Sequence, residues 1–278
     1  MPDGGHIVVP GIGLLGPEHG RLLFAVGVFD GIHRGHVYLL AELRRAARHL
    51  HARPAVITFD AHPDELLVGA APLLVCDPEE RLVRLDRAGV GVTVVQHFDD
   101  ALRRTPYDTF VAGLRARAEL AGFLMTPDAA FGHGRQGTPA ALAELGARVG
   151  FSVVVVPALD LGGRAVRSSE IRSAVATGEL DEAERLLGRP YAVAGRAGRS
   201  GDVDARRAAL AFDLPVALPP SGAYRATVEP AWSPGRQARG PVVRGVAEVG
   251  PGPGLVVVAR RPLPAAGRLR VAFIEPGG

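Results

Sequence analysis

Short apolar runs alternate with helical spacings between residues 22 and 157. Each apolar run is only a few residues long and is bounded by glycine, proline or polar residues, so each predicts a buried strand. The predicted strands are residues 22–26, 54–59, 92–95 and 151–157. Apolar residues that recur every three or four positions predict helices that begin at Arg34, span Glu79 to Ala88, and span Asp108 to Leu120. Strands that alternate with helices indicate an α/β fold with a parallel sheet.

The last third of the chain has a different pattern. From about Gly195, glycine and proline are frequent and apolar residues alternate with polar ones, as in residues 223–228. This pattern predicts a small antiparallel β-barrel. We therefore expect two domains, an α/β domain over residues 1–190 and a β-barrel domain over residues 191–278.

Residues 1–20 carry a glycine pattern typical of dinucleotide binding, but without its structural context. Residues 11–16 match GxGxxG after the apolar run 7–9. The dinucleotide motif requires a helix to begin there, whereas Pro17 and Gly20 interrupt the residues that follow. We therefore reject dinucleotide binding here and expect a flexible lead-in.

The composition narrows the class of protein. The 278 residues are 47% hydrophobic and include one cysteine, which excludes a disulfide framework and favours a reducing compartment. No apolar run is long enough for a membrane span, and the N-terminus lacks the layout of a signal peptide, so we expect a soluble, cytoplasmic protein. All 32 basic residues are arginine, and they are scattered among Asp and Glu. Despite the net charge of +3, we therefore expect no nucleic-acid partner.

The most informative segment is the loop between the strand 22–26 and the helix that begins at Arg34. It contains three glycines and two histidines: Gly27, Gly31, Gly35, His33 and His36. Glycines let the backbone approach a ligand closely, and the first turn of a helix offers free N–H groups and the positive end of its dipole. Two imidazoles three positions apart can reach the same bound group. The loop therefore predicts a phosphate site.

Two other interpretations apply to these histidines. Either could be an ordinary surface or core residue near a turn, although the combination of strand, glycines, histidine pair and helix start favours a function. A metal site is disfavoured, because no further Cys, Asp or Glu occurs here at ligand spacing. We therefore assign no protein ligand to a metal.

A second segment that suits phosphate spans Val166 to Arg172. Ser168 and Ser169 are placed to cap the helix that follows, with hydroxyl and N–H groups available to phosphate oxygens. Arg172, one turn further, can supply a forked pair of donors. Capping alone would also explain the serines, and a solvated helix face would explain the arginine.

These two segments resemble motifs of one known family. The string from Gly27 to His36, Gly-x-Phe-Asp-Gly-x-His-x-Gly-His, contains the HxGH motif of the nucleotidyltransferases. It is similar to the first motif of the bacterial FAD synthetases, the FMN adenylyltransferase module of bifunctional riboflavin kinase/FAD synthetases. Residues 166–172 are similar to that family's Ile-Ser-Ser-Thr-x-Ile-Arg motif, with Arg167 at the position of a serine, and residues 178–191 match its linker helix. The resemblance implies a Rossmann-like nucleotidyltransferase domain.

Two further segments carry the resemblance. Residues 59–63 resemble the family's Phe-(Glu/Asp)-Pro-His-Pro loop, with Ala61 in place of the first proline. This loop follows a predicted strand, at the edge where open α/β sheets place ligands, although His62 could also be a purely structural residue. Residues 126–132 resemble the family's Gly-x-Asp-Phe-x-Phe-Gly, with Ala129 at the position of the first phenylalanine. The four motifs occur in the family's order.

The resemblance implies roles for the matching residues. The implied catalytic residues are His33, His36 and Arg172. The implied nucleotide-binding residues are Gly27, Phe29, Asp30, Gly31, Gly35, Asp128, Ser168 and Ser169. The implied flavin- or acceptor-binding residues are Phe59, His62, Pro63, Phe131 and Gly132. The implied reaction transfers AMP from ATP to FMN, giving FAD and pyrophosphate, with Mg²⁺ neutralising charge on the leaving group.

The predicted barrel resembles the family's riboflavin kinase, but without its catalytic parts. Residues 202–218 stand where the family has Gly-x-Pro-Thr-Ala-Asn, and residues 255–260 lack the carboxylate of the kinase's general base. We therefore expect no riboflavin kinase activity. Because Ala129 and Arg167 depart from the family, two alternatives stay open. One is transfer of AMP or CMP to a different phosphorylated small molecule, and the other is binding of flavin or nucleotide without catalysis.

Overall fold

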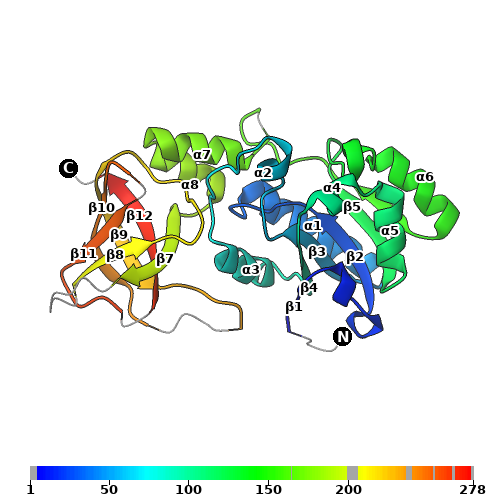
Figure 1. The fold of residues 1–278 in the computed structure, drawn as a ribbon, viewed down its shortest axis with the longest axis horizontal. Coiled ribbons are helices and arrows are strands. Elements are labelled where there is room, and N and C mark those ends of the chain that lie inside the picture. Colours follow the sequence, from blue (N-terminus) through cyan, green and yellow to red (C-terminus); the bar gives the residue numbers. More distant parts are fainter. Residues whose placement is uncertain are drawn as a thin grey trace. The chain divides into compact units, whose positions relative to one another are not determined.

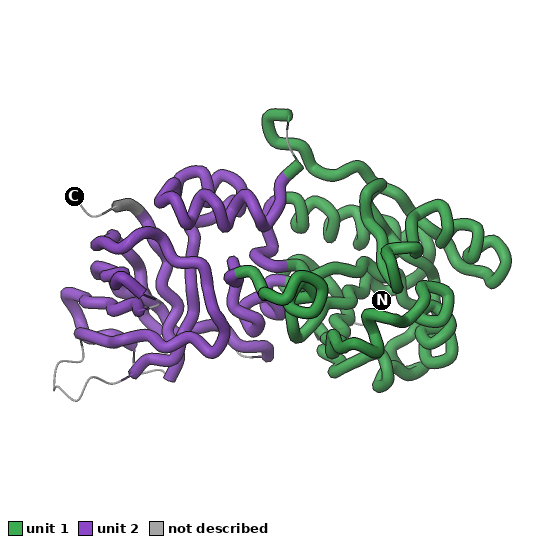
Figure 2. The backbone as a smooth tube through the Cα atoms, turned by 45° about the horizontal axis from the view of Figure 1, so that its top comes forward, with its two compact units in different colours: residues 1–29, 35–72, 85–165 green, residues 30–34, 73–84, 166–278 purple. Residues whose placement is uncertain are grey.

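The chain divides into two compact units (Figure 2). The computed structural model describes residues 5–163, 165–198, 206–235, 240–252, 254–264 and 267–276. The first unit comprises residues 1–29, 35–72 and 85–165, and the second comprises residues 30–34, 73–84 and 166–278. The boundary runs through the histidine loop, so that His33 belongs to the second unit and His36 to the first. The division into sequence domains at residue 190 stays a prediction.

The first unit is built on a six-stranded parallel sheet (Figure 1). Its strands are β1 (Ile7–Val9), β2 (Arg21–Val26), β3 (Arg53–Phe59), β4 (Val92–Gln96), β5 (Glu119–Met125) and β6 (Ser152–Val155). They lie in the order β1-β4-β3-β2-β5-β6, and every neighbouring pair is parallel. The helices that lie wholly or mostly in this unit are α1 (Arg34–His49), α2 (Pro63–Leu67), α4 (Asp100–Arg104), α5 (Tyr107–Arg115) and α6 (Pro139–Val149), whereas most of α3 (Pro78–Arg87) belongs to the second unit. The predicted α/β fold with a parallel sheet is confirmed.

Strand β5 corrects one prediction from the sequence. The helix expected over residues 108–120 ends at Arg115 as α5, and Glu119 already begins a strand. A continuous apolar strand cannot be distinguished from a buried helix by periodicity, and residues 120–125 are all buried. Gly122 lies at a shift in register between β5 and β2, and an added Cβ there would lie 1.9 Å from the carbonyl oxygen of Ser152.

The N-terminal segment corrects a second prediction. The flexible lead-in expected over residues 1–20 instead contributes the edge strand β1, followed by the 3₁₀ helices η1 (Ile12–Leu14) and η2 (Pro17–His19). Strand β1 pairs with β4, and the imidazole Nε2 of His6 lies 2.8 Å from the hydroxyl of Thr93. Three residues are too few to give a periodic signal, so only the neighbouring strand makes this segment a strand. Residues 1–4 lie outside the described part of the chain.

The sheet reverses its direction of growth between β2 and β5. From β2 the chain moves outward through β3 to β4, and it returns to the other side of β2 as β5. Open α/β sheets bind ligands beyond the carboxyl ends of the strands at such a switch point. The fold therefore favours the loops that begin at Gly27 and Thr126 as ligand-binding segments.

The second unit contains a closed antiparallel barrel (Figure 1). Its strands are β7 (Ala192–Gly198), β8 (Arg207–Ala211), β9 (Gly222–Pro230), β10 (Val243–Val249), β11 (Leu255–Ala259) and β12 (Arg268–Pro276). They close in the order β10-β11-β8-β7-β12-β9. Two helices precede the barrel: α7 (Ser168–Thr177) and α8 (Leu180–Leu187). The predicted barrel is confirmed, and no helix within the described residues has the length and apolarity to cross a membrane.

Candidate functional site

In the first unit, the loop that follows β2 has a strained backbone. The hydroxyl of Thr58, in the neighbouring strand β3, donates a hydrogen bond of 2.9 Å to the carbonyl of Val28. Phe29 follows with a φ of 53° and a side chain that is 3% exposed. A bulky residue at positive φ is uncommon, and such strain clusters at ligand sites. Gly27 lies directly against the Phe29 ring, because an added Cβ would be 3.3 Å from it.

His36 lies on the first turn of α1 and packs against the same phenylalanine. The ring centroids of Phe29 and His36 are 5.0 Å apart. This aromatic contact restricts the imidazole of His36, which lies beside Gly35 at the start of the helix. The first turn of α1 therefore presents an imidazole and free N–H groups together, which suits a phosphate.

Asp30 is held by the rest of the second unit rather than left open to a ligand. Its carboxylate oxygens accept hydrogen bonds of 3.0 Å from the backbone N–H groups of Val75 and Cys76. Burial raises the pKa of Asp30, while these N–H groups and the nearby Arg172 lower it, and the net shift is upward. In this structure the Asp30 carboxylate therefore fixes the loop, and its implied contact to nucleotide stays a prediction.

The serine-rich motif meets the same loop. Ser168 donates a hydrogen bond of 2.8 Å to the carbonyl of Asp30, and Arg172 lies 3.4 Å from the Asp30 carboxylate. The predicted capping role of the serines is wrong for Ser168, because the N-cap of α7 is Arg167 and Ser168 is the first helical residue. The hydroxyl of Ser168 instead ties α7 to the loop, while Ser169 follows as an exposed residue.

His33 is buried, and its pKa is lowered. His33 is only 4% exposed. Burial, followed by the positive charge of Arg189, lowers the pKa of His33 to about 4. The imidazole is therefore neutral at physiological pH, so it can donate one N–H hydrogen bond to a phosphate without bringing a charge.

The loop after β3 contains the predicted acceptor residues Phe59, His62 and Pro63. The Nδ1 of His62 accepts from the backbone N–H of Asp64 at 3.2 Å, and His62 is the N-cap of α2 with Pro63 at the first helical position. Phe59 packs edge-on against Phe98, with ring centroids 5.3 Å apart. The structure thus gives His62 a structural task, and its implied role toward an acceptor stays a prediction.

The loop after β5 is a tight turn with little room. Gly132 has a φ of 76°, and an added Cβ would lie 2.7 Å from the backbone of Tyr107. Phe131 and Gly137 exchange two backbone hydrogen bonds, which close the loop. Phe131 also packs against Phe123, with ring centroids 5.3 Å apart. These contacts make Phe131 and Gly132 a rigid edge beside β5.

Residues near both ends of the loop after β5 also make structural contacts. The carboxylate of Asp128 accepts a hydrogen bond of 2.7 Å from the hydroxyl of Thr126. Thr138 is the N-cap of α6 and Pro139 its first residue, both favoured residue types at these positions. Ala129 is partly buried against the hydrophobic core of the sheet.

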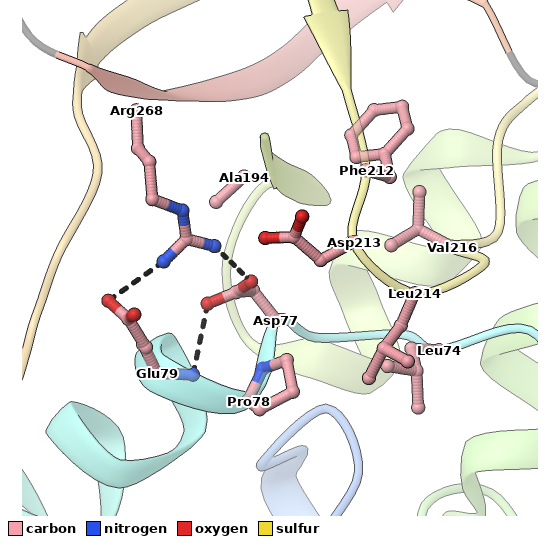
Figure 3. A pocket seen from close by; sticks show the side chains of 10 residues that line it. All are labelled: Leu74, Asp77, Pro78, Glu79, Ala194, Phe212, Asp213, Leu214, Val216 and Arg268. Carbon is pink, nitrogen blue, oxygen red and sulfur yellow. Dashed lines mark hydrogen bonds and ion pairs between the residues drawn. The ribbon is translucent and has the colours of Figure 1, made fainter. Parts of the chain in front are cut away.

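The second unit also contains a pocket against the barrel (Figure 3). Its cavity volume is about 150 Å³, and its wall includes Phe212, Asp213 and Leu214. At one side, Arg268 pairs with Asp77 and with Glu79, the latter at 2.8 Å. These ion pairs occupy three of the charged groups that line the pocket, and Asp213 pairs with Arg196.

The described residues contain no preformed group of metal ligands. Among them, no group of three or more His, Cys, Asp or Glu side chains could hold a metal ion. Mg²⁺ in nucleotide sites commonly takes one or two protein carboxylates together with substrate phosphates and water, so it does not require such a group.

Sequence reasoning missed four contributors to the site. Thr58 lies within an apolar strand, and Val75 and Cys76 act through backbone N–H groups, which leave no side-chain signal. Arg189 lies in the segment that matches the family's linker helix, and that match alone gave it no role.

The fold and the loop define a class of protein first. A parallel sheet with an HxGH loop after its central strand, followed by a closed barrel, is the architecture of an α/β nucleotide-binding protein with a β-barrel domain. The FAD synthetase family matches residues 16–170. This chain belongs to that family.

Characterised relatives carry one name, bifunctional riboflavin kinase/FMN adenylyltransferase. The protein of Haemophilus influenzae is 34% identical over 173 residues, which are 62% of this chain and 56% of that protein. The protein of Escherichia coli K12 is 32% identical over 65% of this chain and 58% of its own length. The match thus spans less than two thirds of these relatives. The Bacillus subtilis protein is 26% identical over 85% of this chain and 74% of its own length.

A solved structure supports the fold over nearly the whole chain. The crystal structure titled macrolide-efflux protein from Streptococcus pneumoniae has a TM-score of 0.77 and 24% sequence identity. The likeness covers 98% of this chain and 90% of that chain. At this identity the likeness shows the fold alone.

Proposed function

We propose that this protein is an FMN adenylyltransferase, which transfers the AMP group of ATP to FMN and releases pyrophosphate. One observation carries the proposal. Within the second unit, Ser168 and Arg172 contact Asp30, which precedes them by 138 and 142 positions. Two motifs that suit phosphate are therefore held together, and family membership supplies the nucleotide and flavin as substrates.

The proposed reaction is an in-line displacement at the α-phosphorus of ATP. A phosphate oxygen of FMN attacks that phosphorus, and the bond to the bridging oxygen of the β-phosphate breaks, so pyrophosphate leaves with the electron pair. Such a reaction depends mainly on positioning and on stabilising the negative charge that builds up. We assign the phosphate contacts to His33 and His36, and we assign the β- and γ-phosphates to Ser168, Ser169 and Arg172.

The remaining predicted residues complete the proposed pockets. Gly27, Phe29, Gly31 and Gly35 would let the nucleotide approach the backbone, and Asp30 and Asp128 would shape its pocket. The acceptor flavin would contact the two loops that follow β3 and β5: Phe59, His62, Pro63, Phe131 and Gly132. Mg²⁺ enters as part of the MgATP substrate, where it neutralises charge on the leaving pyrophosphate. We also propose a cytoplasmic location.

We further propose that the barrel has no riboflavin kinase activity. Residues 202–218 contain neither the threonine nor the asparagine that the resemblance leads one to expect, and residues 202–205 lie outside the described part of the chain. Phe212, Asp213 and Leu214 of this stretch line the pocket shown in Figure 3. Strand β11, Leu255–Ala259, carries no carboxylate. The proposal is supported by the absence of the threonine, the asparagine and the strand carboxylate, because a kinase needs groups that position the metal nucleotide and deprotonate the hydroxyl group.

The experiment that tests the function is release of pyrophosphate from MgATP with FMN, with riboflavin, or with no acceptor, while chromatography follows FAD. FAD from FMN alone, with no FMN from riboflavin, is the expected result. Formation of FMN from riboflavin would overturn the kinase proposal. Nucleotide binding without FAD would overturn the choice of FMN as acceptor, and a screen of other phosphorylated acceptors with ATP and CTP would follow. Binding without any turnover would indicate a non-catalytic protein.

A further inference from the structure

Ile32, the residue before His33, has a strained backbone. Its φ is 38°, in the left-handed region that β-branched residues avoid. Its side chain is 3% exposed, so the strain is not relieved at a mobile surface. A strained residue persists only where its surroundings impose the conformation, and such residues cluster at functional sites. Some group must therefore hold the Gly31–Ile32 turn in place.

Arg189 is the group that contacts this turn. Its Nη1 donates a hydrogen bond of 2.9 Å to the carbonyl of Ile32, and its Nη2 donates to the carbonyl of Gly31. Nη1 also lies 3.3 Å from the carbonyl of Leu187. The planar guanidinium group presents its donors in a fixed fork, so two adjacent carbonyls are held at one relative orientation. A residue 157 positions later in the chain thus fixes the peptide groups that lead into His33.

The end of helix α8 is shaped to deliver this arginine. Gly188 ends the helix with a φ of 74°, and an added Cβ would lie 3.2 Å from the Arg34 side chain. Gly31 has no room for a side chain, because an added Cβ would lie 2.8 Å from Val75. Close packing on both sides therefore leaves Arg189 directly against the Gly31–Ile32 turn.

The charge of Arg189 also acts on His33. Burial, and then the nearby charge of Arg84, lowers the pKa of Arg189 to about 10, so the group is still positively charged at neutral pH. The other titratable groups that face it are Cys76, Glu80 and Arg270. Its positive charge disfavours a proton on His33, in addition to the larger effect of burial.

We propose that Arg189 is a positioning residue: by holding the carbonyls of Gly31 and Ile32 it fixes the strained turn that orients His33. This inference rests on the proposed role of His33 in adenylyl transfer. Arg189 itself touches no reacting atom. Its effect is to restrict the His33 imidazole to one position, and its charge adds to the burial that keeps the ring neutral.

The test compares Arg189→Gln and Arg189→Lys with the parent protein. For both variants kcat for FAD formation should fall roughly 10- to 100-fold, because a displacement of about 1 Å costs that much, while KM for ATP changes by less than about threefold. An NMR titration of the His33 ring, assigned with His33→Gln, supplies the second readout. The His33 pKa should rise from about 4 in Arg189→Gln and stay near it in Arg189→Lys, which keeps the charge.

Arg185→Gln is the matched control. Arg185 lies in α8, the helix that precedes Arg189, and its side chain pairs with Glu182 at the surface, so this variant should keep parent values of kcat and of the His33 pKa. A folded Arg189→Gln or Arg189→Lys variant with kcat within threefold of the parent would overturn the proposal. If Arg189→Gln does not fold, Arg189→Lys decides. If the parent makes no FAD, the proposed function fails, yet the titration of His33 in the variants still decides whether Arg189 acts on it.

Discussion

Replacing Glu80 with glutamine should strongly destabilise the second unit. The Glu80 side chain is 3% exposed, and its carboxylate accepts hydrogen bonds from Arg84 and, at 3.0 Å, from Arg270. Loss of one partner from a buried ion pair leaves the other charge unpaired and costs about 3–5 kcal/mol. Arg270 keeps a second partner in Glu229 at 2.9 Å, so we expect the lower half of that range.

The magnitude can be compared with a surface pair of the same composition. Glu182 pairs with Arg185 at 2.6 Å on α8, and both side chains are more than 40% exposed. Exposed pairs contribute about 0.2–1 kcal/mol. Glu182→Gln is therefore the control, and the difference between the two variants isolates the effect of burial.

The single tryptophan of the chain provides the assay. Trp232 lies under both arginines, with guanidinium carbons 4.8 Å and 4.7 Å from its ring centroid in Arg84 and Arg270. Its fluorescence during urea denaturation therefore reports on this network. Glu80→Gln should lower the free energy of unfolding by about 3 kcal/mol with an unchanged m-value. A loss below about 1 kcal/mol, equal to that of Glu182→Gln, would refute the reasoning.

The carboxylate of Glu80 also predicts that the stability of the protein depends on pH. Burial raises the pKa of Glu80, but Arg270 and Arg84 outweigh it and hold the pKa below the ordinary value of 4.5. A carboxylate with a depressed pKa contributes stability above the unfolded-state pKa, and this contribution is lost as pH falls through the folded-state pKa. The parent protein should therefore lose stability below pH 4.5, and Glu80→Gln should lose less.

Three further outcomes are expected. His36→Ala should abolish FAD formation in a variant that still folds, and near-normal turnover would exclude the proposed mechanism. Asp30→Ala should lower the free energy of unfolding by about 2–6 kcal/mol, because two buried N–H groups lose their acceptor at about 1–3 kcal/mol each. A smaller loss, measured by urea denaturation, would show that water replaces the carboxylate as acceptor. Burial lowers the pKa of His6, whose imidazole contacts the hydroxyl of Thr93. His6 should therefore contribute stability above pH 6.5, and this contribution should be lost as pH falls. The urea midpoints of His6→Gln should lack this dependence on pH.

The sequence predicted the elements whose hydrophobic period is regular. The strand β2, the helix α1 and the barrel strand β9 follow from apolar spacing alone, because burial on one face or on both repeats with the geometry of the element. The caps of α6 and α8 were also predictable, since Thr138 and Gly188 act on their own helices. Where the pattern was ambiguous, as at residues 119–125, the sequence favoured the wrong element.

The sequence by itself determined the α/β architecture, the barrel and the residue types of the phosphate motifs, because these depend on local spacing and composition. Only the tertiary structure decided that the Asp30 carboxylate binds the N–H groups of Val75 and Cys76, that Ser168 contacts the loop instead of capping its helix, and that Arg189 holds the turn before His33. Hydrogen bonds between residues 45 to 157 positions apart leave no periodic trace in a chain, because their geometry exists only after the strands and helices have packed.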